Sequence, residues 1–215
     1  MPDTLAIAQS FLSLRQVETR FQLNPTVDPA FFAEATAAQT AQITLSPAER
    51  QTLDRIRASY RYSSAEGDLT EATVNLLLVS PLLYLAGFCD PPFRLQAEAS
   101  VEIVLDDRNE RYTGRIDTLV ICQDLWVAIV ESKRTRFAAS TGIPQALAYA
   151  CANPDRDRPL FALVTNGDNF LFLKIQGNHY AISSDFSIYS QPENGLYGVL
   201  RLLKSIASQV EEIRV

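Results

Sequence analysis

The sequence predicts one α/β domain over residues 1–215, in which a central mixed sheet is flanked by helices. Two observations lead to this fold class. The middle of the chain contains apolar strands of the kind that are buried on both faces, and helical segments with one apolar face stand before and after them. We expect a core of the order α-β-β-β-α-β at residues 63–190, after a helical extension at 1–62 and before a closing helix at 191–215.

Composition and charge restrict the kinds of partner. The chain is 47% hydrophobic and 20% charged, which is typical of a folded globular protein. Its formal net charge is -6, so the protein as a whole should repel a polyanion. Binding of a nucleic acid would therefore depend on a local basic patch or on bound cations.

Cysteine usage and the apolar runs predict a soluble, cytoplasmic protein. The three cysteines are widely spaced in apolar segments, which indicates buried free thiols rather than disulfides or a zinc site; they are Cys89, Cys122 and Cys151. The amino terminus has no basic region of the kind that opens a secretory signal. The apolar runs are shorter than the roughly 18 to 20 residues of a membrane span, so no membrane partner is expected.

The first 60 residues are predicted to be helical in three segments. Apolar residues at helical spacing favour a helix at 4–23. Asp28, followed by a proline, is expected to cap an alanine-rich helix that ends near Gln42. The Ser-Pro-x-Glu pattern that begins at Ser46 is a capping box and should open the third helix.

A further apolar helix is predicted before the strands begin. It covers residues 69–87, with Asp68 or Thr70 as its cap and Gly87 as its end. Pro81 lies inside this segment and is a candidate position for a kink. This helix is the first element of the expected core.

The strands follow from alternation and from turn signals. Apolar and polar residues alternate over 93–105, which predicts a half-buried strand. Two strands at 111–122 and 125–133 are apolar on both faces and should lie at the centre of the sheet. The remaining predicted elements are a helix at 141–152, strands at 160–165, 170–176 and 179–183, and a helix from residue 196.

Three charged residues on the two central strands are the candidate catalytic group. Asp117 lies among apolar neighbours, where a carboxylate is costly unless it is paired or binds a metal. Glu131 and Lys133 are two residues apart in a strand, so their side chains point to the same face. A three-residue connection would set Asp117 opposite Glu131, whereas a two-residue turn would offset the pairing by one.

Such a pair of carboxylates suits a divalent cation. The cation removes the repulsion between the two charges, and oxygen ligands without His or Cys nearby favour Mg²⁺ or Mn²⁺ over zinc. The backbone carbonyl of Ser132 is a further candidate ligand. Lys133 would then stabilise the pentavalent phosphate or help to deprotonate the attacking water.

This pattern resembles the PD-(D/E)XK nuclease superfamily, and most closely the amino-terminal nuclease domain of the R subunit of type I restriction enzymes. The resemblance covers residues 69–166. Asp117 matches the first carboxylate of the motif, although Ile116 replaces its proline, and the Glu-x-Lys from Glu131 to Lys133 matches the second part. The resemblance implies a restriction-endonuclease-like core and Mg²⁺-dependent hydrolysis of phosphodiester bonds in DNA.

The same resemblance assigns residues on the two flanking helices. Gln145 and Tyr149 match a Q-x-x-x-Y signature; they share a helical face and are expected to bind phosphate or to orient the metal ligands. Glu71 stands where an acidic residue is expected on the first core helix, as a third carboxylate at the metal. Glu66 and Glu98 are alternatives for that role.

Structural interpretations stand beside the functional ones. Asp117 and Glu131 could be strand residues that are merely salt-bridged to neighbouring cations, and Gln145 and Tyr149 could be ordinary helix surface. Other residues with two interpretations are Arg134 and Arg136, which are either a solvated strand end or a patch that contacts phosphate, and His179, for which a surface position is favoured over catalysis.

Two functions from different classes therefore follow from the sequence. The first is a metal-dependent deoxyribonuclease with DNA as its partner. The second is a non-catalytic module that keeps the nuclease fold and acts as a homodimer or as a subunit of a larger complex. The acidic net charge supports the second, because a free-standing nuclease with this charge needs help to find its target.

Overall fold

The computed structural model describes residues 3–39, 42–105, 110–123 and 125–212. The helices are α1 (Ile7–Ser10), α2 (Leu14–Phe21), α3 (Ala33–Gln39), α4 (Pro47–Ser64), α5 (Glu71–Val74), α6 (Ser80–Leu85), α7 (Ile143–Ala150) and α8 (Leu196–Glu212), with a π-helical turn at Asn75–Val79 and a 3-10 turn at Ala139–Gly142. The strands are β1 (Asp3–Ala6), β2 (Asn24–Pro25), β3 (Phe93–Leu105), β4 (Glu110–Cys122), β5 (Leu125–Ser132), β6 (Leu160–Thr165), β7 (Asn169–Gln176), β8 (His179–Ile182) and β9 (Phe186–Ser187).

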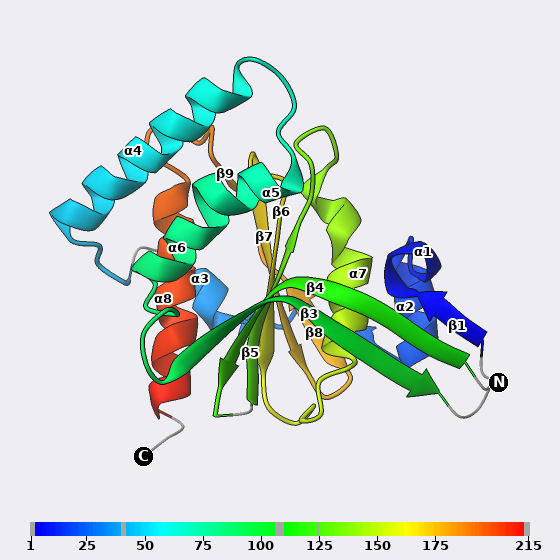
Figure 1. Cartoon of the computed structure of the whole chain (residues 1–215). Coiled ribbons are helices and arrows are strands. Elements are labelled where there is room, and N and C mark those ends of the chain that lie inside the picture. Colours follow the sequence, from blue (N-terminus) through cyan, green and yellow to red (C-terminus); the bar gives the residue numbers. More distant parts are fainter. Residues whose placement is uncertain (1–2, 40–41, 106–109, 124, 213–215) are drawn as a thin grey trace.

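These strands form one mixed sheet with helices on both faces, which confirms the predicted α/β class (Figure 1). The strand order is β1-β4-β5-β6-β7-β8-β2, with β3 paired to β4 and β9 paired to β7. Only β1 with β4, β2 with β8 and β5 with β6 are parallel pairs among the described residues. Helix α7 lies between β5 and β6 in the chain, as a crossover between parallel neighbours requires.

The sheet separates two hydrophobic cores. One core lies under α3, α4, α6 and α8, and the other lies under α1, α2 and α7, which Figure 1 shows on opposite sides of the sheet. Strand β5 contributes to both, because Val130 packs in the first core and Ile129 in the second. Its position at the centre of a sheet covered on two sides was predicted and is confirmed.

The amino-terminal segment differs from the predicted helical extension. Residues Asp3–Ala6 form a strand that pairs in parallel with the start of β4, so the helix predicted from residue 4 is wrong there. The helical stretch is also broken after α1, and Ser13 opens α2 with a capping box. Strand β2 pairs with β8. The segment thus supplies a strand to each end of the strand order instead of lying outside the sheet.

Asp28 does not cap the second predicted helix. Its carboxylate accepts a hydrogen bond from the backbone of Ala30 at 2.9 Å and closes a local turn, so α3 begins only at Ala33. The end predicted near Gln42 is not observed as a helix, and residues 40–41 lie outside the described residues. The capping box at Ser46 is confirmed and opens α4.

The first core helix is interrupted by a π-helical turn. Thr70 is its cap, because the Thr70 hydroxyl accepts from the backbone N–H of Thr73 at 3.2 Å. The π-helical turn ends at Val79, directly before α6, and Pro81 is the second residue of α6. A proline ring needs space against the preceding turn and has no N–H to donate, and the wider turn accommodates both conditions. Gly87 follows with a positive φ of 89°, which only glycine adopts without strain.

Strand β3 does not alternate as simply as predicted. Leu95 and Ala97 are exposed, whereas Ala99 and Val101 are buried in the core under α7. Between these pairs, Glu98 has a φ of 51°, and the ladder to β4 skips this residue. A left-handed residue in the middle of a strand turns the chain, so the two halves of β3 present different faces to the core.

The remaining expectations concern exposure. Cys122 is buried and Cys151 is partly buried, but Cys89 is exposed, so the prediction of three buried thiols is wrong at that position. His179 is exposed, as predicted. Among the described residues, no helix is long and apolar enough to cross a membrane.

Candidate metal and phosphodiester site

The register of the central hairpin sets two carboxylates opposite each other. Thr118 pairs with Val130, and continuing this pairing by one step sets Asp117 opposite Glu131. The connection between β4 and β5 is only two residues long, which alone would have offset the pair. An extra residue in β5, Val127, lies between the pairs Val120–Ala128 and Ile121–Trp126; this bulge shifts the register by one residue and compensates for the short turn.

Asp117 is bound to the backbone of the neighbouring strand. Its Oδ2 accepts a hydrogen bond from the N–H of Ser132 at 2.7 Å. In a strand, the N–H and C=O of one residue point to the same neighbour, so the Ser132 carbonyl is also directed toward β4. The hydroxyl of Ser132 lies on the opposite face from Glu131 and donates to Oδ1 of Asn75 at 2.6 Å. The motif is thereby attached to the π-helical turn.

Glu131 is a buried carboxylate with one unpartnered oxygen. Its side chain is 2% exposed, and Oε1 accepts from Nζ of Lys133 at 2.5 Å. Its Oε2 is buried and has no hydrogen-bond partner among the described residues. Burial, followed by the charge of Asp117, raises the pKa of Glu131 to about 8, while Lys133 acts in the opposite direction.

The pKa of Asp117 is also subject to opposing effects. Burial raises its pKa, and the charges of Glu71 and Glu98 add to this effect. The hydrogen bond from Ser132 and the charge of Lys133 lower it. Two carboxylates that both favour the neutral form are a place where a bound cation would be favourable.

A hydrogen-bonded chain fixes Lys133 against α7. Its Nζ also donates to Oε1 of Gln145 at 2.9 Å, and the amide nitrogen of Gln145 donates to the hydroxyl of Tyr149 at 2.8 Å. That hydroxyl donates to the backbone carbonyl of Arg115 in β4 at 2.9 Å. Tyr149 is buried, so it is not ordinary helix surface. Hydrogen bonds through the two helical side chains thus connect Lys133 to the backbone of β4.

Two glycines leave the space that this chain of contacts needs. A Cβ at Gly114 would lie 2.6 Å from the ring of Tyr149. A Cβ at Gly142 would lie 2.7 Å from Val164 and 3.2 Å from Cε of Lys133. The close approach of backbone to side chain at both positions requires the absence of a side chain.

The third acidic residue is placed differently from the first two. Glu71 is the exposed first residue of α5, and its charge raises the pKa values of Asp117 and Glu131. In the described ranges, no three side chains of Asp, Glu, His or Cys form a group that could hold a metal ion, so Glu71 does not converge with the pair. Of the alternatives, Glu66 is exposed in the linker before α5, and Glu98 pairs with Arg115 at 3.2 Å.

The donors that are present fit a hard divalent cation. Asp117, Glu131 and the Ser132 carbonyl supply oxygen ligands only, which suits Mg²⁺ or Mn²⁺. The unpartnered Oε2 of Glu131 is the specific observation that fits a missing positive partner, because an unpaired buried carboxylate oxygen is costly.

The two arginines after the motif lie in an exposed loop. Arg134 and Arg136 are exposed, and the guanidinium of Arg136 lies 4.9 Å from the ring centre of Phe137. The loop is held to the start of the first core helix, since the backbone N–H of Leu69 donates to the hydroxyl of Thr135 at 3.0 Å. Both arginines therefore lie next to the carboxylate pair in the chain and remain accessible.

Sequence reasoning missed Asn75, which contacts the motif through Ser132. Its spacing of four residues from Glu71 was a usable signal, because residues four apart share a helical face. The contact itself required knowing that the Ser132 side chain points toward that helix.

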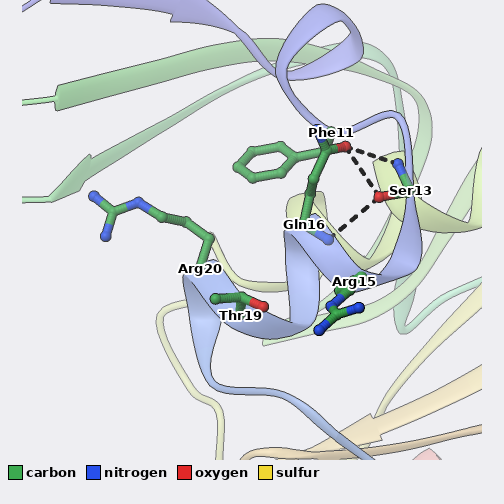
Figure 2. A pocket seen from close by; sticks show the side chains of 6 residues that line it. All are labelled: Phe11, Ser13, Arg15, Gln16, Thr19 and Arg20. Carbon is green, nitrogen blue, oxygen red and sulfur yellow. Dashed lines mark hydrogen bonds between the residues drawn. The ribbon is translucent and has the colours of Figure 1, made fainter.

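A separate pocket lies along α2, away from the motif residues. It has a volume of about 420 Å³, and Figure 2 shows its lining, in which the capping box of Ser13 and Gln16 forms one wall and Arg15 and Arg20 project from the helix. No carboxylate is among the lining residues described, so this pocket does not supply a cation site.

No protein-family model matches the sequence, and no match was found among curated proteins. Among solved structures, the chain is similar to a fragment described as an HsdR subunit of a type I restriction enzyme from Vibrio vulnificus YJ016, with a TM-score of 0.41 and 22% identity. The match covers 63% of this chain and 25% of that chain. A likeness of this size does not establish a shared fold, so the function is argued from the side chains.

Proposed function

We propose that this chain is a metal-dependent nuclease of the PD-(D/E)XK type that hydrolyses phosphodiester bonds in DNA. The proposal is carried by Glu131, which is buried close to Asp117, has one oxygen without a hydrogen-bond partner among the described residues, and is followed two residues later by a lysine that donates to its other oxygen. Few structural roles call for two such carboxylates and a lysine in one place, whereas phosphodiester hydrolysis uses all three.

The side chains take distinct roles in this proposal. Asp117, Glu131 and the Ser132 carbonyl would hold Mg²⁺ or Mn²⁺, and the exposed Glu71 would add only its negative charge near the site. When bound, the ion supplies charge neutralisation at the phosphate and activates water. Lys133 places its ammonium beside the reacting phosphate and stabilises the developing negative charge.

The remaining residues position the lysine and the DNA. Gln145 and Tyr149 orient Lys133 through the hydrogen bonds to the β4 backbone. Arg134 and Arg136 contact flanking phosphates from the loop that follows. Because the protein carries a net charge of -6, a partner subunit or a second copy would help to deliver the DNA.

The direct test is cleavage of supercoiled plasmid and of single-stranded circular DNA with Mg²⁺ or Mn²⁺. We expect Lys133→Ala and Asp117→Asn each to lower the rate on the order of 100-fold or more, since each removes a group that acts on the transition state. Lys204→Ala is the matched control, because Lys204 also pairs with a glutamate, at 2.6 Å, but on α4 and α8. Cleavage by the wild type no faster than by Lys133→Ala would refute the proposal.

A second candidate is a non-catalytic module with the same architecture. The observation that favours it is that Glu131 already pairs with Lys133, while Glu71 does not complete a three-carboxylate group among the described residues. Calorimetric titration with Mn²⁺ distinguishes the two. Binding that Asp117→Asn abolishes supports the nuclease, and no heat of binding in either protein supports the module.

A further inference from the structure

Two half-exposed aromatic rings flank the turn at residues 166–168, next to the proposed catalytic lysine. The backbone N–H of Lys133 donates to the carbonyl of Thr165, directly before this turn, at 2.7 Å. On one side, the amide of Asn166 donates to the carbonyl of Phe137 at 2.8 Å. In Figure 1 the loop after β5 and the turn between β6 and β7 lie at the upper edge of the sheet.

Tyr189 lies on the other side of the same turn. The residue before it donates its N–H to the carbonyl of Asp168 at 2.9 Å. Residue Tyr189 is 49% exposed, and residue Phe137 is 43% exposed. Two large aromatic residues thus reach solvent from segments that are hydrogen-bonded to the same three-residue turn beside Lys133.

An arginine guanidinium lies over each of the two rings. The guanidinium of Arg136 lies 4.9 Å from the ring centre of Phe137, and that of Arg61, from α4, lies 5.8 Å from the ring centre of Tyr189. An arginine over an aromatic face stacks on it and keeps donors free for a phosphate. The two pairs therefore offer a base-stacking face and a phosphate contact each.

The turn between the pairs is held in place. The hydroxyl of Tyr60, which is fully buried, donates to Oδ1 of Asp168 at 2.8 Å. A Cβ at Gly167 would lie 2.5 Å from that hydroxyl, so the turn packs directly on Tyr60. The turn that both ring-bearing segments contact is thus anchored on Tyr60.

We propose that these two arginine–aromatic pairs bind unpaired bases and adjoining phosphates of single-stranded DNA that leads to the carboxylate pair. A stacked duplex hides the faces of its bases, whereas a single strand can lay them on exposed rings. Acidic groups also lie near the surface, namely Asp168 in the turn and Glu66 and Asp68 in the linker before α5. Charge alone would therefore bind poorly there, and stacking is the contribution that selects a single strand.

The direction of the bound single strand, toward Lys133, rests on the proposed function. The binding itself can be tested without cleavage. Binding of labelled oligo(dT) and of a duplex of equal length is measured by fluorescence anisotropy in EDTA. We expect tighter binding of oligo(dT) than of the duplex. Phe137→Leu and Tyr189→Leu, which keep an apolar side chain without a ring face, should each weaken oligo(dT) binding about 5-fold or more, since stacking contributes about 1–3 kcal/mol per base.

Two controls separate stacking from general effects. Tyr84→Leu removes an aromatic ring that is 66% exposed on α6, and it should leave oligo(dT) binding unchanged. Arg50→Gln and Arg61→Gln change the net charge equally, and Arg50 also lies over a ring, 5.0 Å from that of Tyr197. Arg61→Gln should weaken binding more than Arg50→Gln. Thermal melting confirms that each variant is folded.

The outcomes distinguish this inference from the nuclease proposal. Equal affinity for single strand and duplex, no measurable binding of oligo(dT), or equal effects of Tyr84→Leu and Tyr189→Leu would overturn the single-strand surface. If Phe137→Leu and Tyr189→Leu weaken oligo(dT) binding but no metal-dependent cleavage is observed, the single-strand surface is supported and the nuclease proposal is refuted. Metal-dependent cleavage, together with oligo(dT) binding that neither Phe137→Leu nor Tyr189→Leu weakens, would support the nuclease and refute the single-strand surface.

Discussion

At the scale of single residues, the site is dominated by the cost of burying Glu131. Its side chain is almost fully enclosed and faces Asp117, so the neutral carboxyl is favoured and its pKa rises to about 8. Lys133 offsets part of this cost through the hydrogen bond to Oε1, but Oε2 stays without a partner among the described residues. A bound cation would offset the remainder of this cost.

The raised pKa of Glu131 predicts a specific pH dependence of stability. The pKa is near 4.5 in the unfolded chain and about 8 in the folded one, so the folded state binds more protons between these values. The favourable contribution is complete below about pH 4.5 and is lost as the pH rises through about 8. Glu131→Gln keeps the shape of the side chain but cannot titrate. The free energy of unfolding should therefore decrease less with rising pH in this variant, by up to a few kcal/mol.

Urea unfolding in EDTA at pH 5 and pH 9 measures this effect. The wild type should lose more free energy of unfolding between the two values than Glu131→Gln does. Glu98→Gln is the control, because Glu98 is an exposed carboxylate near the same site. An identical loss in wild type and Glu131→Gln would show that Glu131 is ionised in the folded protein at both pH values.

At the scale of elements, the site depends on irregularities within otherwise regular structure. The bulge in β5 at Val127 corrects the register between Asp117 and Glu131, and the π-helical turn brings Asn75 to Ser132. The sequence predicted the central strands and the same-face placement of Glu131 and Lys133, because period 2 is fixed by strand geometry. It could not predict the bulge, because the β5 residues around Val127 are apolar and suit either face.

The 3-10 turn before α7 gives a prediction about packing. Gly142→Ala would add a Cβ 2.7 Å from Val164 and 3.2 Å from Cε of Lys133, so the lysine or the turn must move. We expect a loss of roughly 1–3 kcal/mol in the free energy of unfolding, as for other overpacked positions, together with a loss of DNA cleavage. Ser140→Ala changes an exposed residue of the same turn and should leave both unchanged. Wild-type stability and cleavage in Gly142→Ala would show that this turn is free to shift.

The π-helical turn gives a second prediction at this scale. Asn75→Ala and Ser132→Ala each remove one partner of the 2.6 Å hydrogen bond and leave the other partly buried and unpaired. Each should cost about 1–3 kcal/mol, and the double variant should cost less than the sum, because the second change removes a group that is already unpaired. Urea unfolding of all four proteins gives the coupling energy. Additive losses would show that the turn does not support the motif through this contact.

At the scale of the whole molecule, the core order was predictable and the edges were not. Each core element has a local signal, such as the alternation in β3 or the capping of the first core helix by Thr70. Strands β1 and β2 pair with residues more than 100 positions away, and local periodicity carries no information about such a partner. The apolar residues from Leu5 onward also fit a helical spacing, which is why the strand was read as a helix.

This pairing predicts that the amino-terminal segment unfolds together with the rest of the chain. Ile7 follows β1 directly, is fully buried, and its Cδ1 would lie 3.2 Å from a Cβ at Gly114 in β4. Ile7→Ala should cost about 2–5 kcal/mol, as other large-to-small core changes do. For a chain of this length each kcal/mol lowers Tm by roughly 2–4 °C, so we expect one calorimetric transition shifted down by about 5–20 °C. Leu12→Ala, at a position 74% exposed, should shift Tm by less than about 2 °C. If Ile7→Ala instead produced an early minor transition and left the main one in place, residues 1–62 would be an appendage after all, and β1 would not be integral to the sheet that positions Asp117.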